Sequence, residues 1–174
     1  MLLDAIRSQY QYSRWANHRI LEAAFNLTVE QSLTIVTAGY LCLRDILVHT
    51  MSWEWIWLSR WKGVFPRAEF EPNDFPNVHA IQARWTEIEE DTERFIDQLN
   101  SASFSKVIAY VHERGEEWAY PLWQQLIHQA DHATYHRSEV AVMLTRFGCS
   151  PGDLAYLIYQ DEISSSENAK EWLK

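Results

Sequence analysis

The sequence predicts an all-α protein: a four-helix bundle with a small β-hairpin before the last long helix and a short C-terminal helix. Four long segments carry apolar residues at the three- and four-residue spacing of a single helix face. The connections between these segments are short, which is typical of bundles. Only 5 Gly and 5 Pro occur among 174 residues, and this scarcity favours helices over a loop-rich fold.

The first predicted helix spans residues 2–25. Its apolar stripe is broad and is interrupted by polar side chains, and the segment YSRWAN places Trp15 and Asn17 among them. We expect a packed Trp15 and a solvent-facing Asn17, with the alternative that both line a functional pocket. Thr28 and Gln31 then have the spacing of a capping box, so a short helical turn is predicted to begin there.

The second predicted helix spans residues 40–61 and is closed by a glycine just beyond its end. His49 is its single histidine, and Trp53, Trp57 and Trp61 follow at four-residue intervals, so an imidazole stands at the head of an aromatic ridge. A lone histidine on an apolar helix is most often a hydrogen-bonded core residue. His49 is a candidate ligand only because partner histidines occur elsewhere in the chain.

The middle of the chain combines an irregular connection, a third helix and a hairpin. Residues 62–76 hold three of the five prolines. Asn77 is predicted to cap a helix that runs through Leu99. We expect its acidic residues to form a solvated face without a paired-carboxylate site: Glu87, Glu89, Glu90, Asp91 and Glu93. Residues 106–120 alternate β-branched and aromatic residues around a glycine, which predicts a hairpin.

The fourth predicted helix, residues 121–147, carries the strongest functional signal. His128, His132 and His136 recur every fourth residue and therefore share one stripe of the helix. Apolar residues at helical spacing place part of that stripe beside the core. Neutral imidazoles one turn apart can converge on one divalent cation of the zinc, nickel or copper kind. The alternative is that these are surface or packed histidines whose spacing is accidental.

The remaining pieces carry little functional signal. His79 and His112 have no partner at ligand spacing and are expected at the surface. After a turn at Pro151 and Gly152, residues 153–160 form a short apolar piece, and a partly docked polar tail is expected to follow. No repeat or linker divides the chain, so residues 1–174 are predicted to form one domain.

Composition excludes several classes of function. The 15 Lys and Arg against 24 Asp and Glu give a net charge of −9, which opposes binding to nucleic acid or to an anionic membrane surface. No apolar run is long enough to span a bilayer and no signal-peptide pattern opens the chain, so a cytoplasmic protein is expected. Cys42 and Cys149 are far apart in sequence, which favours reduced thiols over a disulfide scaffold.

Taken together, these segments resemble the DinB-like family of helical-bundle metalloproteins. The resemblance covers most of the chain: YSRWAN near the start, LRDILVHTMSWEWIWLSRWKG in the second helix, LIHQADHATYHRSEV in the fourth, and DLAYLIYQ after it. The family pattern in the fourth helix looks like H-x-x-x-H-x-x-x-H-R-G-[QE]. Ser138 stands at the glycine position, which is a mild departure.

The resemblance implies a divalent ion held by one histidine of the second helix and two of the fourth, with water completing the shell. Carried over by motif, the ligands are His49, His132 and His136. His128 is expected beside the ion, or as a substitute ligand. Zinc or nickel is the expected ion, with iron, manganese or copper as alternatives. The resemblance also implies frequent homodimers, which an expected set of exposed tryptophans would suit.

Two carboxylates are candidates for supporting roles at this site. Asp45 and Glu139 each lie about one turn from an expected ligand, so they could orient its imidazole. In a hydrolase, either could serve as the carboxylate base.

Three neutral imidazoles would leave an ion its full charge and at least one open coordination position, where water or a thiol loses its proton readily. Relatives with assigned activities include thiol-dependent transferases and isomerases. The resemblance therefore implies an enzyme that transfers a low-molecular-weight thiol to a small electrophile, with the tryptophan ridge lining the pocket. A metal-hydroxide hydrolase and a non-catalytic metal-binding stress-response protein are the alternatives.

Overall fold

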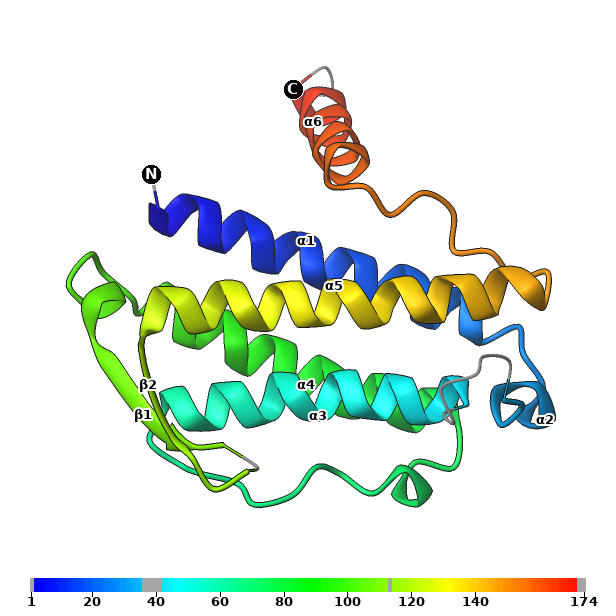
Figure 1. Cartoon of the computed structure of the whole chain (residues 1–174). Helices are drawn as coiled ribbons and strands as arrows, with labels where there is room; N and C mark the ends of the chain where they lie inside the picture. Colours follow the sequence, from blue (N-terminus) through cyan, green and yellow to red (C-terminus); the bar gives the residue numbers. More distant parts are fainter. Residues whose placement is uncertain (1, 36–41, 113, 172–174) are drawn as a thin grey trace.

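The protein folds into a bundle of four long helices, shown in Figure 1 for the computed structural model, which describes residues 2–35, 42–112 and 114–171. The long helices are α1 (Leu2–Ala24), α3 (Leu43–Trp61), α4 (Val78–Asp97) and α5 (Leu122–Arg146). The shorter elements are α2 (Val29–Ser32), the 3₁₀ turns η1 (Pro72–Asp74) and η2 (Ser103–Ser105), strands β1 (Val107–Val111) and β2 (Glu117–Pro121), and α6 (Tyr156–Glu171). The predicted mainly helical fold is confirmed.

Each long helix packs against two others, so the four enclose a common core. Helix α5 lies between α1 and α3, and α4 closes the ring by contacting both α1 and α3. The apolar stripes predicted from the sequence meet inside this ring, where Leu47, Met51, Trp85, Met143 and Leu144 are fully buried. Packing of these stripes, which removes apolar surface from water, supplies the main stabilisation of the bundle.

The helix ends form where their capping residues predict them. The Thr28 side chain accepts a hydrogen bond from the Gln31 amide, and the Gln31 side chain accepts one from the Thr28 amide, which completes the capping box of α2. Asn77 caps α4 by accepting from the Ala80 amide at 3.0 Å. Gly63 follows the end of α3 with φ of +83°, a left-handed conformation that favours glycine. The predicted start of α3 at residue 40 lies outside the described residues.

The hairpin packs on the first turns of α5 and on α3. Strands β1 and β2 pair antiparallel, with Tyr110 opposite Trp118. The Gln125 amide on α5 donates to the carbonyl oxygens of Ile108 and Tyr120, at 2.9 and 2.8 Å, and so ties both strands to the helix. The buried Tyr110 ring then meets the Trp57 ring of α3 edge-on, with centroids 5.2 Å apart.

The C-terminal helix is longer than predicted. Most of the apolar piece and much of the expected polar tail form one helix, α6, which starts at Tyr156 and projects from the bundle in Figure 1. Its buried Tyr159 packs against Tyr12 and Trp15 of α1, and the Trp15 Nε1 atom donates to Glu162 at 2.9 Å. Trp15 is therefore packed, as expected, but it serves the contact with α6.

Asn17 and Glu89 contradict the sequence predictions. Both are buried, with 1% and 4% of their surfaces exposed, and the Asn17 amide donates to Glu89 at 2.9 Å. Arg137, also buried, donates to the Asn17 oxygen at 3.1 Å. A cation in the bundle interior needs polar partners, which draws these side chains inward from α1 and α4. Asn17 therefore does not face solvent, and Glu89 does not belong to a solvated face.

Glu89 has a buried carboxylate neighbour, Glu54, which lies on α3 outside the acidic segment of α4. Glu54 is 6% exposed and accepts a hydrogen bond from Trp85 Nε1 at 2.8 Å. Its burial and the negative charge of Glu89 raise the pKa of Glu54 to about 8. Glu54 is therefore mostly protonated at neutral pH, so its burial does not place a full negative charge in the core.

Within the described residues, no helix combines the length and the hydropathy that crossing a membrane requires.

Candidate metal centre

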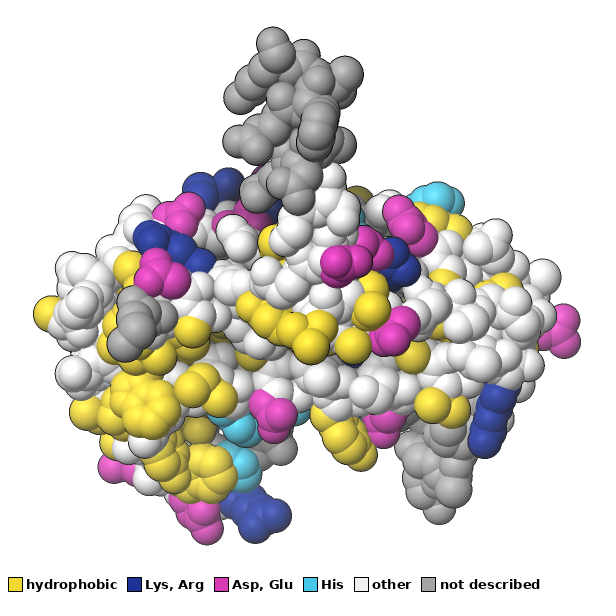
Figure 2. Space-filling model, turned by 90° about the horizontal axis from the view of Figure 1, so that it is seen from above, with side chains coloured by type: hydrophobic (Ala, Val, Ile, Leu, Met, Phe, Trp, Pro, Cys, Tyr) yellow, Lys and Arg dark blue, Asp and Glu magenta, His cyan; other side chains and the backbone are white. Residues whose placement is uncertain are grey.

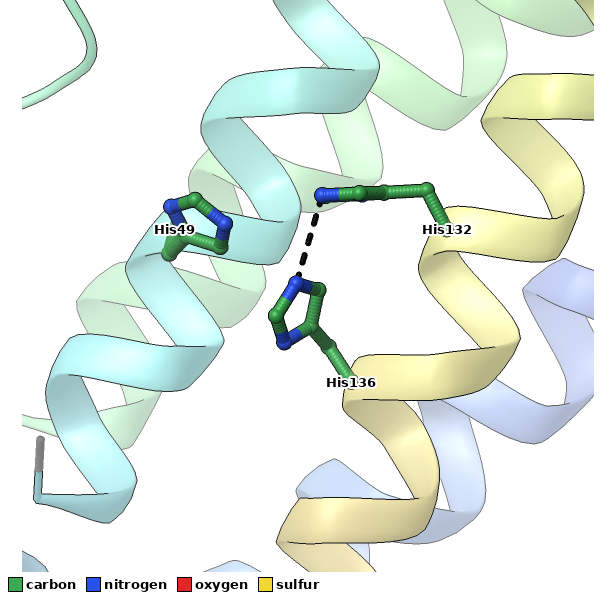
Figure 3. Close-up of side chains that lie close together, drawn as sticks. All are labelled: His49, His132 and His136. Carbon is green, nitrogen blue, oxygen red and sulfur yellow. Dashed lines mark hydrogen bonds between the residues drawn. The ribbon is translucent and has the colours of Figure 1, made fainter. Parts of the chain in front are cut away.

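Helices α3 and α5 pack side by side and bring His49 opposite His132 and His136 (Figure 3). The ring centroids of His132 and His136 lie 4.5 Å apart, and that of His49 lies 5.4 and 4.7 Å from them. One ring nitrogen from each residue lies within 4.8 Å of the others. Residues separated by more than eighty positions in the chain thus converge on one small volume.

The two histidines of α5 already have the spacing that a shared ion requires. Their Nε2 atoms lie 3.2 Å apart. Two nitrogens bound to one tetrahedral zinc at ~2.0–2.1 Å are about 3.3 Å apart, so an ion could replace this hydrogen bond with little movement of the rings. The donor set fits a divalent ion of the zinc or nickel kind.

Carboxylates fix the orientation of two of the three rings. Glu69 lies 2.7 Å from Nδ1 of His49, and Glu139 lies 2.7 Å from Nδ1 of His136. An imidazole that donates from Nδ1 to a carboxylate keeps the lone pair of Nε2 for a metal ion. His49 and His136 are therefore held in the tautomer that metal binding needs.

Sequence analysis missed Glu69, which lies in the proline-containing connection between α3 and α4. Its other carboxylate oxygen accepts from Trp53 Nε1 at 3.0 Å, and the connection is anchored to α3 by a hydrogen bond from the Phe70 amide to Ser52. Burial acts to raise the pKa of Glu69, but the hydrogen bonds from His49 and Trp53 outweigh it, and the pKa is lowered. No spacing rule could have linked this loop residue to His49.

Unlike His49 and His136, His132 has no carboxylate that orients its ring. Its Nδ1 atom is buried and has no hydrogen-bond partner among the described residues. Burial, and then the charges that the neighbouring histidines would carry, lower the pKa of His132 to about 4. Its imidazole is therefore neutral at physiological pH, which is the form that binds a metal ion.

Comparison with known proteins shows the family and the fold of the chain. Residues 2–169 match the model of the DinB family. The chain belongs to the DinB family. A crystal structure of a conserved protein from Enterococcus faecalis has the same fold, with a TM-score of 0.62 and 14% sequence identity over 78% of this chain and 92% of that one. A search of curated proteins found no match.

The other predicted site residues of this DinB protein fall into two groups, and the first lies at the site. Trp53 packs beside His49 and His132, with centroid distances of 6.1 and 5.8 Å. The ring of His128 is 6.5 Å from that of His132 and 5.3 Å from that of Trp57. His128 and Trp57 therefore border the three-histidine group without joining it.

The second group lies elsewhere. Asp45 accepts two hydrogen bonds from Arg44, at 3.1 Å each, so its carboxylate is committed away from His49. Trp61 stacks on Phe95 in the core. Trp15 and Asn17 serve the α6 contact and the buried polar network described above. Of the two carboxylates proposed to orient ligands, only Glu139 contacts one.

His79, His112 and the two cysteines lie outside the three-histidine group. The exposed His79 stacks on Phe25, and the half-buried His112 stacks on Trp118 in the hairpin. Cys42 and Cys149 are both free thiols.

A hollow of about 250 Å³ opens beside His132, and we call it the aromatic hollow. Its lining consists of four aromatic residues, three histidines and one arginine: Trp53, Trp57, Tyr110, Trp118, His112, His128, His132 and Arg60. Because α3, α5 and the hairpin all contribute to it, the hollow exists only in the folded bundle. It offers a small molecule a binding place directly against the three-histidine group.

Proposed function

We propose that this DinB protein binds a divalent metal ion through His49, His132 and His136 and transfers a low-molecular-weight thiol to a small electrophile. Zinc or nickel suits three imidazoles best, and iron, manganese or copper is also compatible with them. The observation that carries the proposal is the convergence of these three rings beside the aromatic hollow.

Each partner of the reaction has a place in this arrangement. Held by His49, His132 and His136, a divalent ion would supply the positive charge that lowers the pKa of a thiol in the site. The thiol releases its proton to solvent, its sulfur forms a bond to the electrophilic carbon, and the leaving group departs with the electrons of its own bond. Glu69 and Glu139 keep the imidazoles oriented, and the rings around the aromatic hollow hold the electrophile and exclude water.

The state of the carboxylates favours thiol transfer over hydrolysis. A metal-hydroxide hydrolase would be assisted by a free carboxylate that takes a proton from the attacking water. Glu69 and Glu139 are each hydrogen-bonded to an imidazole, and Asp45 is paired with Arg44. A thiol needs no such base, because the ion alone would keep it ionised at neutral pH.

The experiment compares two substrates on metal-loaded protein. 1-Chloro-2,4-dinitrobenzene is offered with and without a small thiol such as cysteine, and its conversion is followed by absorbance. We expect turnover above the uncatalysed rate only when thiol and metal are both present, and its loss in His132→Ala. His79→Ala, which changes an exposed histidine stacked on Phe25, is the matched control and should retain full activity.

Two outcomes would overturn the transferase. Hydrolysis of 4-nitrophenyl acetate that needs metal but no thiol, without thiol transfer, would assign the site to a hydrolase. Full metal occupancy without turnover across a panel of thiols and electrophiles would assign it to a non-catalytic metal-binding protein.

A further inference from the structure

A second hollow, which we call the hairpin hollow, lies where the hairpin meets the first turns of α5 (Figure 1). It has a volume of about 270 Å³. Its lining combines four aromatic residues, two glutamines and one histidine: Trp57, Tyr110, Trp118, Tyr120, Gln124, Gln125 and His128. The described residues that line it include no Lys, Arg, Asp or Glu. The hairpin hollow is therefore suited to a neutral molecule with a flat apolar body.

Gln125 brings an unused hydrogen-bond acceptor to this hollow. Its side chain is only 2% exposed, and its Nε2 atom donates to the carbonyl oxygens of Ile108 and Tyr120. Because these two carbonyls can only accept, they fix which end of the amide is the amine and which is Oε1. Oε1 is buried and has no hydrogen-bond partner among the described residues. A buried acceptor without a donor is rare in folded proteins, so it indicates a place for a donor from outside the chain.

Trp57 brings an unused donor to the same hollow. Its side chain is 3% exposed, and its Nε1 atom is buried without a hydrogen-bond partner in the described part of the chain. By contrast, the indole nitrogens of Trp15, Trp53 and Trp85 each donate to a carboxylate. The lining of the hairpin hollow thus includes one donor and one acceptor that the described chain leaves unpaired.

Exposed side chains form part of the wall of the hairpin hollow. Tyr120 is 42% exposed, and Gln124 and His128 are exposed as well. The ring of His128 stands edge-on to that of Trp57, with centroids 5.3 Å apart. Exposed side chains change rotamer within nanoseconds, so an entering molecule can turn His128 aside and reach the indole of Trp57.

These features together define the class of guest. A carboxamide is neutral and carries an N–H donor beside a carbonyl acceptor. A carboxylic acid would enter as an anion at neutral pH and would meet no cationic side chain in the described lining. An aromatic ring attached to the amide would pack against the walls that Tyr110 and Trp118 provide.

We propose that the hairpin hollow binds a small aromatic carboxamide, whose N–H donates to Oε1 of Gln125 and whose carbonyl oxygen accepts from Nε1 of Trp57. The hairpin hollow shares four lining residues with the aromatic hollow: Trp57, Tyr110, Trp118 and His128. The amide would therefore bind next to the candidate metal centre. Its binding requires neither the ion nor the thiol of the proposed function.

The test compares two probes of nearly equal size: N-methylbenzamide and propiophenone, in which a CH₂ group replaces the amide N–H. Their dissociation constants are measured by NMR titration of the full chain without thiol. We expect the amide to bind about fivefold more tightly, because only the amide can donate to Gln125. Propiophenone is the more apolar probe, so burial of apolar surface alone would give the opposite order.

The indole N–H resonance of Trp57 reports the second hydrogen bond. It is the signal that disappears in Trp57→Phe, and it should move downfield when N-methylbenzamide binds. Trp57→Phe should weaken binding of both probes about fivefold, since both carbonyl oxygens would accept from this donor. Trp61→Phe is the matched control. Trp61 is also buried with an unpaired Nε1 among the described residues, but it does not line the hollow, so both affinities should stay unchanged. Circular dichroism and unfolding curves confirm that both variants fold.

Equal or weaker binding of N-methylbenzamide than of propiophenone by the unaltered chain would overturn the proposal, whatever the stability of the Trp57 variant. Binding of the amide that leaves the Trp57 resonance unmoved would place it elsewhere and would overturn the proposal as well. Because no thiol is present, these outcomes are separate from those for the transferase. Turnover of 1-chloro-2,4-dinitrobenzene without any preference for the amide would leave the proposed function standing and remove the carboxamide site.

Discussion

Glu69 lies 2.7 Å from Nδ1 of His49, although twenty residues of chain separate the two. This contact makes the connection between α3 and α4 a part of the candidate metal centre. On the other side of the site, Glu139 contacts Nδ1 of His136 in the same way. A ligand held by a charged partner is more basic and loses less freedom when it binds an ion.

Glu69→Gln should weaken metal binding about 10- to 100-fold, because a neutral amide holds the His49 imidazole less firmly than a carboxylate does. The affinity is measured by competition with a chromophoric chelator. Glu71→Gln, two residues later and exposed, is the control and should bind as the unaltered protein does. Equal affinity in both variants would show that Glu69 has no orienting role.

The three-histidine group should bind one ion per chain. His132→Ala removes a ligand nitrogen and should cost more than the ~100-fold expected from loss of an orienting partner. His128→Ala is the control, since that ring only borders the group and its loss should change affinity by a few-fold at most. Elemental analysis after dialysis gives the stoichiometry. A stronger loss in His128→Ala than in His132→Ala would reassign the ligand.

Glu54 should make the protein less stable as the pH rises. Burial, and then the charge of Glu89, raise its pKa from the usual 4.5 to about 8 in the folded protein. Between these two values the folded state holds a proton that the unfolded chain releases, so the free energy of unfolding falls as pH increases from about 5 to 8. The slope is on the order of 1 kcal/mol per pH unit.

Glu54→Gln should flatten this pH dependence, because glutamine resembles the protonated acid and can still accept from Trp85. Urea unfolding at pH 5, 6, 7 and 8 measures the slope. Glu87→Gln, on the exposed surface of α4, should leave it unchanged. A slope that stays the same in Glu54→Gln would mean that Glu54 is ionised in the folded protein at neutral pH.

The outer side of α1 and α5 should form a homodimer contact. Leu2, Trp123 and Ile127 are exposed there by 47%, 37% and 46%, and Leu2 and Ile127 border a hollow of about 320 Å³ between the two helices. Figure 2, which looks onto this side of the bundle, shows hydrophobic side chains across it. The sequence analysis expected exposed tryptophans to suit a homodimer, but most tryptophans in the described chain are at least partly buried. The exposed apolar residues of this face are therefore the basis for the predicted homodimer.

Sedimentation velocity distinguishes a monomer from a dimer. We expect a dimer for the unaltered chain and a monomer for Ile127→Glu, because a charge in the contact would have to be desolvated. Val142→Glu, at another exposed apolar position of α5, should remain dimeric. If the unaltered chain is a monomer, the predicted homodimer is wrong.

Much of the site followed from local rules. Histidines four residues apart on α5 necessarily share one stripe, and the family resemblance supplied His49 as their partner. The same periodicity explains why the three tryptophans do not all lie beside the histidines. Each four-residue step turns the helix by about 40°, so Trp61 is rotated about 120° from His49. Trp53 therefore remains beside the histidines, while Trp61 packs on Phe95 in the core.

The sequence by itself determined the long helices, their caps, the hairpin and the histidine stripe, because each depends on residues close together in the chain. Only the tertiary structure decided that Glu69 returns to His49, that Asn17 and Glu89 turn inward to Arg137, and that Arg60 enters the aromatic hollow. The spacing of residues along a helix sets the direction in which a side chain leaves its own axis. Which charge, ring or loop covers that side chain depends on distant segments, whose arrangement is set by packing of the whole core.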